Sequence, residues 1–143
     1  MGWTSRSFLV AIALSALAVP AYAEDGASKT AQRTLSPAYK KCLNTGDARM
    51  GVMPAMFDCG RDELSRQDEV LNSTYRAVRK NLPPTKQKQL QNLQRHWSAL
   101  RDKKCNTEAD DVGGQAGTII WYGCMIRATE RRIEWLKNFA RKA

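Results

Sequence analysis

The chain lacks most of the features on which enzyme active sites are built. It has one histidine, His96, no G-x-S-x-G or S-x-x-K motif, and no glycine-rich phosphate loop. Its four cysteines are separated by 16, 45 and 18 residues, whereas zinc sites usually carry close C-x2-C pairs. These absences argue against an enzyme and against a metal site, and we expect no cofactor.

No apolar run is long enough to cross a membrane. The longest, Phe8 to Val19, follows Arg6 and precedes Ala21-Tyr22-Ala23, the small-x-small pattern that signal peptidases cut. We therefore predict a secretory signal peptide over residues 1–23 and a periplasmic or secreted mature chain with no integral membrane span. Residues 24–36 are polar, and we expect them to form a flexible leader. We expect residues 37–143 to form one domain.

Acidic residues are the minority among the charged ones. Lys and Arg number 23 against 14 Asp and Glu, which gives a formal net charge of +9. Such a balance favours anionic partners, including cell-wall polymers, acidic lipids and acidic proteins. Nucleic acid is not expected as a partner, because export separates the protein from it.

Four cysteines in an exported chain predict two disulfides. The favoured pairs are Cys42 with Cys59 and Cys105 with Cys124, because each closes a local loop worth about 3 kcal/mol by the chain-entropy estimate. Cys59 with Cys105 remains a competitor, since a helical hairpin brings those two positions close.

Apolar residues recur at steps of four and three through the middle of the chain, which predicts two amphipathic helices over about 54–81 and 86–104. The seam consists of Leu64, Leu71, Tyr75, Val78 and Leu82, then Leu90, Leu93, Trp97 and Leu100. Thr85 is the expected cap of the second helix. A glycine-containing loop over 106–117 and a third helix from its cap Thr118 to about residue 141 follow. We expect an all-α fold, an up-down three-helix bundle stapled by disulfides at one end.

Polar residues interrupt the seam. Folding the chain at Pro83-Pro84 places Asp68 within a turn of Arg101 and Asn72 beside Gln94, while two residues of the third helix fall near the same level. Losing one partner of a buried charge pair is costly, so such a network fixes helix register rather than performing catalysis. The predicted structural polar core is Asp68, Asn72, Gln94, Arg101, Thr129 and Arg132.

Three short patterns carry a resemblance to a known family. D-x2-L-N-x2-Y begins at Asp68, Q-x2-W-x3-R-D-x2-C begins at Gln94, and C-x4-T-x2-R-x3-L begins at Cys124. Together they resemble the LprI-like lysozyme-inhibitor domain family over residues 42–136. The resemblance implies a small disulfide-linked helical domain outside the cytoplasm, and it implies inhibition of lysozyme.

The leading functional hypothesis is an exported, non-enzymatic binding protein that inhibits lysozyme by occluding its cleft with the loop 106–117. Because C-type lysozymes are strongly basic, acidic clusters are expected to make the contact. The candidates are Asp62 with Glu63, or the set Glu108, Asp110 and Asp111.

An alternative places binding on the third helix. Aromatic residues there stand beside lysines and arginines, a composition that suits an anionic cell-envelope component such as peptidoglycan or acidic lipid. The candidate residues are Trp121, Trp135 and Phe139.

Overall fold

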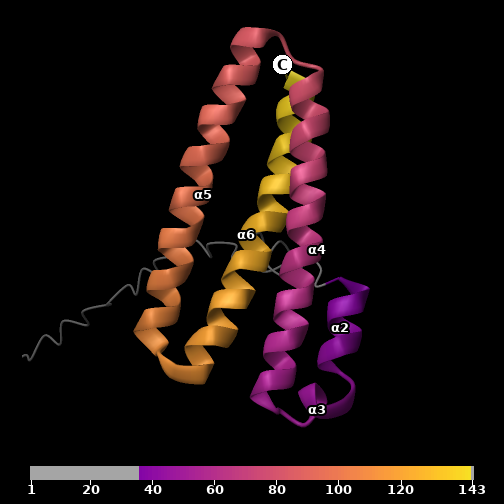
Figure 1. The fold of residues 1–143 in the computed structure, drawn as a ribbon, viewed down its shortest axis with the longest axis vertical. Helices are drawn as coiled ribbons and strands as arrows, with labels where there is room; N and C mark the ends of the chain where they lie inside the picture. Colours follow the sequence, from indigo (N-terminus) through magenta and orange to yellow (C-terminus); the bar gives the residue numbers. More distant parts are fainter. Residues whose placement is uncertain (1–35, 143) are drawn as a thin grey trace, which may run out of the picture. The chain divides into compact units, whose positions relative to one another are not determined.

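The computed structural model describes residues 36–142, and every regular element in that range is a helix (Figure 1). The elements are α2 (Pro37–Leu43), α3 (Gly46–Arg49), α4 (Met53–Lys80), α5 (Pro84–Val112) and α6 (Gly114–Lys142). The all-α class is therefore confirmed for the described residues. The described residues contain two short helices before the three long ones, whereas the sequence predicted three helices in all.

Two predicted segments fall mainly outside the described residues. The predicted signal peptide, residues 1–23, lies wholly outside them, as does the predicted leader 24–36 except for Ser36. The Ser36 hydroxyl accepts a hydrogen bond from the Tyr39 N–H at 3.1 Å and so caps α2. Among residues 36–142, no helix is both long and apolar enough to cross a membrane.

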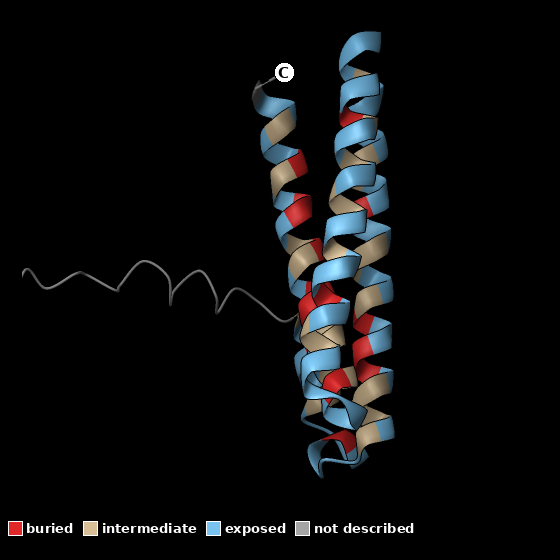
Figure 2. Cartoon of the chain, turned by 90° about the vertical axis from the view of Figure 1, so that its left-hand side faces the viewer, coloured by how far each residue is buried: buried red, intermediate tan, exposed pale blue. Residues whose placement is uncertain are grey.

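The three long helices run in alternating directions, and α6 is the central one. It packs along both α4 and α5, whereas α4 and α5 make little contact with each other (Figure 1). Buried residues accordingly lie on the sides of the helices that face one another, and the outward sides are exposed (Figure 2).

This order changes which residues of α5 are buried. Leu90 is fully buried and Trp97 packs beside it, as predicted, but Leu93 and Leu100 are 37% and 53% exposed. The seam prediction assumed that α5 packs mainly on α4. Because its partner is α6, the buried face is rotated by about one position, and the prediction for these two leucines is wrong.

The junction between α5 and α6 also differs from the prediction. α5 continues to Val112, and only Gly113, with φ of 72°, separates it from α6. Gly113 and Gly114 (φ 56°) adopt the left-handed conformation that reverses the chain, which few other residues adopt without strain. The predicted loop 106–117 is therefore wrong, since most of it is helical.

The predicted helix caps are wrong as well. Thr118 lies inside α6, where its hydroxyl donates to the Gly114 carbonyl at 3.4 Å. α5 begins before Thr85, with Pro83 at the cap position and Pro84 in the first turn. Proline suits a first turn because its missing N–H would have no partner there in any case.

Two disulfides hold one end of the bundle. Cys42–Cys59 joins α2 to α4 with a Cα–Cα distance of 5.7 Å, and Cys105–Cys124 joins α5 to α6 at 5.5 Å. These are the two pairs that the sequence favoured. They lie where α4 begins, α5 ends and α6 begins, so the end of the bundle that carries the α5–α6 turn is covalently fixed.

Candidate functional site

The α5–α6 turn carries a concentration of negative charge at the disulfide-linked end. Glu108, Asp110 and Asp111 lie in the last two turns of α5, and between residues 105 and 126 there is no Lys or Arg. Val112 follows them and is 55% exposed. We call Glu108, Asp110, Asp111 and Val112 the acidic tip.

The carboxylates of the acidic tip are largely available to a partner. Asp110 and Asp111 are exposed and form no ion pair within residues 36–142. Glu108 pairs with Lys104 at 3.6 Å, and both side chains are exposed enough that water screens the pair. The three predicted acidic residues therefore lie beside the α5–α6 turn, in a helix rather than in the predicted loop.

The acidic tip is held by close packing between the two helices. A Cβ atom built on Gly117 would lie 2.5 Å from the Ala109 carbonyl oxygen, so the α5 and α6 backbones nearly touch there. The Trp121 indole N–H donates to the Asn106 side-chain oxygen at 2.9 Å. Together with Cys105–Cys124, these contacts fix the orientation of the tip before any partner binds.

A shallow hollow of about 380 Å³ lies beside the tip. Its wall is mostly backbone and small residues, with two aromatic side chains at one side. The lining residues are Ala109, Asp110, Gly113, Gly114, Gly117, Thr118, Trp121 and Tyr122. One acidic-tip residue, Asp110, therefore borders a surface depression.

The prediction that Asp62 and Glu63 form an acidic cluster available for binding is wrong. Asp62 is exposed, but Glu63 is fully buried. Both oxygens of the Glu63 carboxylate accept hydrogen bonds, one from Gln67 Nε2 at 2.8 Å and the other from Arg66 Nη2 at 2.9 Å and Ser36 Oγ at 2.6 Å. Glu63 therefore ties α2 to α4 and is not available to a partner.

The buried carboxylate influences two neighbours. Burial, and then the charge of Glu63, raises the pKa of Tyr39. Burial and Glu63 also raise the pKa of Glu130, against the opposing effect of Arg131 and Arg127. The charge of Glu63 therefore acts on one group of α2, Tyr39, and on one group of α6, Glu130.

The sequence does hold a signal that identifies Glu63. Position 63 is four residues after Cys59, so both side chains lie on one face of α4. Once Cys59 is paired with Cys42, that face is covered by α2. The recurrence of apolar residues marks only the face of α4 toward the long helices, so it does not indicate this second buried face.

Most of the residues predicted for the polar core do interact across the helices. Arg101 Nη1 lies 3.5 Å from an Asp68 oxygen and donates to the Thr129 hydroxyl at 3.1 Å. Arg132 Nε donates to the Gln94 side-chain oxygen at 2.9 Å. Asn72 is exposed and forms no side-chain hydrogen bond with any described residue, so its assignment to the core is wrong.

Two tryptophans complete this core. The Arg132 guanidinium carbon lies 3.8 Å from the Trp135 ring centroid and 5.3 Å from that of Trp97. The Arg101 guanidinium carbon lies 4.9 Å from the same Trp97 centroid. Burial lowers the pKa of Arg132 to about 10, and its Nη2 atom has no hydrogen-bond partner among residues 36–142. The aromatic faces provide the electrostatic attraction that a carboxylate would otherwise supply.

The aromatic residues of α6 that were candidates for binding mostly pack against the core. Trp135 and Phe139 stack with ring centroids 5.0 Å apart against the main core, and Trp121 packs beside the Cys105–Cys124 cluster. All three are half-buried, and the neighbouring Met125 is buried. A continuous exposed aromatic face is therefore not present on this helix.

In the part of the chain that the structure describes, no group of three His, Cys, Asp or Glu residues is arranged to hold a metal ion. His96 is exposed on α5, and Glu63 is occupied by its hydrogen bonds.

The fold and this surface define a class: small helical domains stapled by disulfides that present a charged tip. A family model described as "Lysozyme inhibitor LprI" matches residues 42–136, from the first cysteine to the buried Leu136. The chain therefore belongs to the LprI lysozyme-inhibitor family. No curated protein and no solved structure matches it.

Proposed function

We propose that the protein is an exported, non-enzymatic inhibitor of lysozyme that occludes the enzyme's cleft with the acidic tip. The choice of lysozyme as the partner rests on the family match, since the family is one of lysozyme inhibitors. The two disulfides support a periplasmic or secreted location, because such bonds persist in oxidising compartments. The exposed carboxylates support the choice of surface.

The distribution of charge resolves an apparent conflict between two basic proteins. Residues 70–101 carry seven Lys or Arg and no Asp or Glu, whereas residues 105–126 carry three acidic residues and no basic one. α5 has 29 residues and is about 40 Å long at 1.5 Å per residue. Lys86 and Lys88 at the start of α5 are therefore about 30 Å from Glu108, which is several Debye lengths of about 8–10 Å each in physiological salt. Lys103 and Lys104 lie closer to the tip, and Lys104 is paired with Glu108.

A basic lysozyme that approaches the tip consequently meets the local negative charge. Complementary charges of this kind raise the association rate and fix orientation more than they raise final affinity. The exposed Val112 side chain stands beside the carboxylates and offers an apolar contact that binding would remove from water. Because the tip is held by a disulfide and by close backbone packing, little ordering entropy is lost on binding.

The test is inhibition of a C-type lysozyme on a soluble chitin oligosaccharide by the mature, oxidised protein. A soluble substrate is needed because a basic protein that coats cell walls mimics inhibition. Dose-dependent inhibition is expected. Its absence at high protein concentration would reject the proposed function.

The surface is tested by the triple variant Glu108→Gln, Asp110→Asn, Asp111→Asn. We expect inhibition to weaken by at least about tenfold, mainly through slower association, with unchanged helical content. The matched control Asp47→Asn, Glu69→Gln, Glu134→Gln removes the same charge elsewhere and should retain inhibition. Equal loss in both triple variants would reject the tip as the contact.

A further inference from the structure

We propose that the opposite end of the bundle, at the α4–α5 turn, is a docking surface for an anionic phospholipid membrane. This surface shares no residue with the acidic tip, and the proposal stands independently of lysozyme inhibition. Figure 1 places the α4–α5 turn and the α5–α6 turn at opposite ends of the long helices. Two observations support it: unpaired cations and an apolar pocket among them.

The first observation is a cluster of exposed cations. Arg76, Arg79 and Lys80 lie in the last turns of α4, and Lys86 and Lys88 lie in the first turns of α5. We call these five residues the cationic end. None of them has an acidic partner among residues 36–142, whereas Arg61, near the other end of α4, pairs with Asp58.

α6 adds further positive charge at the same end. Arg141 is exposed in its last turn and its side chain bonds to Asn138 rather than to a carboxylate. Lys137 pairs with Glu134 at 2.7 Å, so its charge is locally balanced. The cationic end therefore extends onto the third helix through Arg141.

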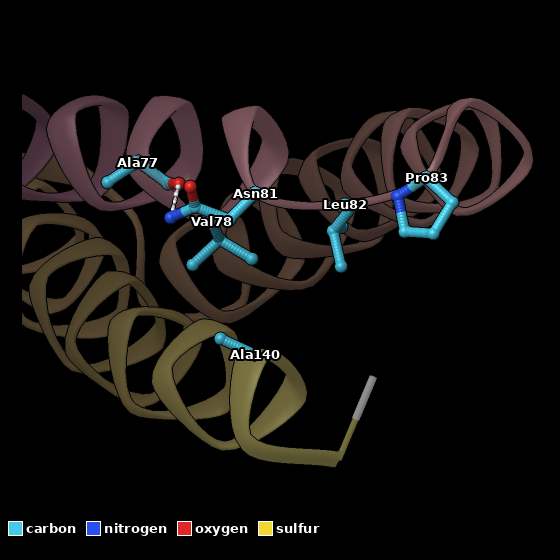
Figure 3. Close-up of a pocket in the computed structure, with 6 residues that line it drawn as sticks. All are labelled: Ala77, Val78, Asn81, Leu82, Pro83 and Ala140. Atoms are coloured by element: carbon cyan, nitrogen blue, oxygen red, sulfur yellow. Dashed lines mark hydrogen bonds between the residues drawn. The ribbon is translucent and has the colours of Figure 1, made fainter.

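The second observation is an apolar pocket of about 230 Å³ at this end (Figure 3). Five of its six lining residues are apolar, and they come from α4, the turn and α6. The lining consists of Ala77, Val78, Asn81, Leu82, Pro83 and Ala140.

Two hydrogen bonds within the chain involve residues of the pocket wall. The Asn81 amide nitrogen donates to the Ala77 carbonyl at 3.1 Å, as the dashed line in Figure 3 shows. The Gln87 amide donates to the Leu82 carbonyl at 2.9 Å. The pocket therefore offers apolar surface rather than hydrogen-bonding groups to whatever occupies it.

Cations around an apolar pocket match the chemistry of an acidic lipid surface. Each Lys or Arg near an anionic membrane strengthens binding about fivefold, and apolar side chains that enter the headgroup boundary add to this. A charged polysaccharide would satisfy the cations but has no group suited to the apolar pocket. Since no described helix crosses a membrane, the contact is peripheral. Docked in this way, the protein would direct the acidic tip away from the membrane.

The charge requirement is tested by sedimentation of the mature, oxidised protein with lipid vesicles. We expect binding to phosphatidylcholine vesicles that contain phosphatidylglycerol, no binding to phosphatidylcholine alone, and loss of binding as salt increases. The variant Arg76→Gln, Arg79→Gln, Lys80→Gln should bind about 100-fold more weakly. The control Lys40→Gln, Lys41→Gln, Lys103→Gln removes the same charge from exposed positions elsewhere and should change binding less than about fivefold.

The apolar requirement is tested at Ala140 with two variants of similar size. Ala140→Gln places a polar amide at the pocket and should weaken vesicle binding well beyond Ala140→Met, whose side chain is apolar. Equal binding by these two variants, or equal loss in the two triple variants, would overturn the proposal. Binding to soluble heparin as tightly as to vesicles would also overturn it and identify a polyanionic polymer as the partner. The Arg76, Arg79 and Lys80 variant should still inhibit lysozyme, which separates this outcome from failure of the proposed function.

Discussion

The substitution Gly117→Ala tests whether the acidic tip depends on close contact between α5 and α6. The added Cβ would lie 2.5 Å from the Ala109 carbonyl oxygen and 3.3 Å from its carbonyl carbon. Both are backbone atoms, so no side-chain rotation relieves the contact and the two helices must move apart. The Gly117 N–H bond to the Gly113 carbonyl, at 2.8 Å, lies within the segment that would shift.

The expected loss follows from two opposing terms. Forcing extra atoms into a packed contact costs about 1–3 kcal/mol, while replacing Gly by Ala inside a helix gains at most about 1 kcal/mol. We therefore expect Gly117→Ala to lower the free energy of unfolding by about 1–2 kcal/mol. Denaturant unfolding of the oxidised protein, followed by circular dichroism, measures it.

Two other glycines provide matched comparisons. At Gly123 the added Cβ would meet only Arg127 Nη1 at 3.0 Å, the end of an exposed and flexible side chain, so Gly123→Ala should be neutral or stabilising by up to about 1 kcal/mol. At Gly60 it would meet Tyr122 Cγ at 2.7 Å, so Gly60→Ala should resemble Gly117→Ala. Wild-type stability in Gly117→Ala, or an equal loss in Gly123→Ala, would refute the reasoning.

Three further variants probe the disulfide-linked end. Glu63→Gln should cost about 2 kcal/mol in denaturant unfolding, because charge-assisted bonds to Arg66 and Ser36 are lost, and an unchanged midpoint would contradict its role in holding α2. Glu130→Gln should raise the melting temperature at neutral pH, because the pKa of Glu130 is raised in the folded state and the free energy of unfolding therefore falls as the pH rises through that pKa. The gain in melting temperature should vanish below pH 4.5, where the wild-type carboxyl is protonated in both states. A gain that does not depend on pH would exclude ionisation of Glu130 as its cause. The double variant Cys105→Ser, Cys124→Ser should cost about 3 kcal/mol in the same unfolding assay and weaken lysozyme inhibition, whereas full retention of inhibition would show that the tip needs no staple.

The parts of the fold that could be predicted are those set by local spacing. The four–three recurrence of apolar residues placed α4 within a residue at each end, since periodicity along a helix does not depend on its partner. Folding at Pro83-Pro84 then brought Asp68 to Arg101, because hairpin geometry follows from the position of the turn.

The parts that could not be predicted depend on which helices touch. Leu93 and Leu100 belong to an apolar pattern, yet the position of α6 between α4 and α5 leaves both exposed. Gly117 looked like a loop residue, because glycine serves both chain reversal and close helix contact. Glu63 looked like a surface acid, and only the packing of α2 explains its burial.

Helix dipoles act differently on the charges of the two ends. The C-terminal turn of α4 favours Arg79 and Lys80 by about 0.3–1 kcal/mol per residue, so at the cationic end charge alone does not distinguish binding from helix stability. The carboxylates of the acidic tip lie in the C-terminal turns of α5, where the dipole of that helix disfavours negative charge, so helix stability does not explain them. The apolar groups at the two ends, Val112 and the Pro83 pocket, satisfy no dipole either. The informative variants at both ends are amides, because an amide removes the charge without adding a reversed charge that would itself interact with a helix dipole.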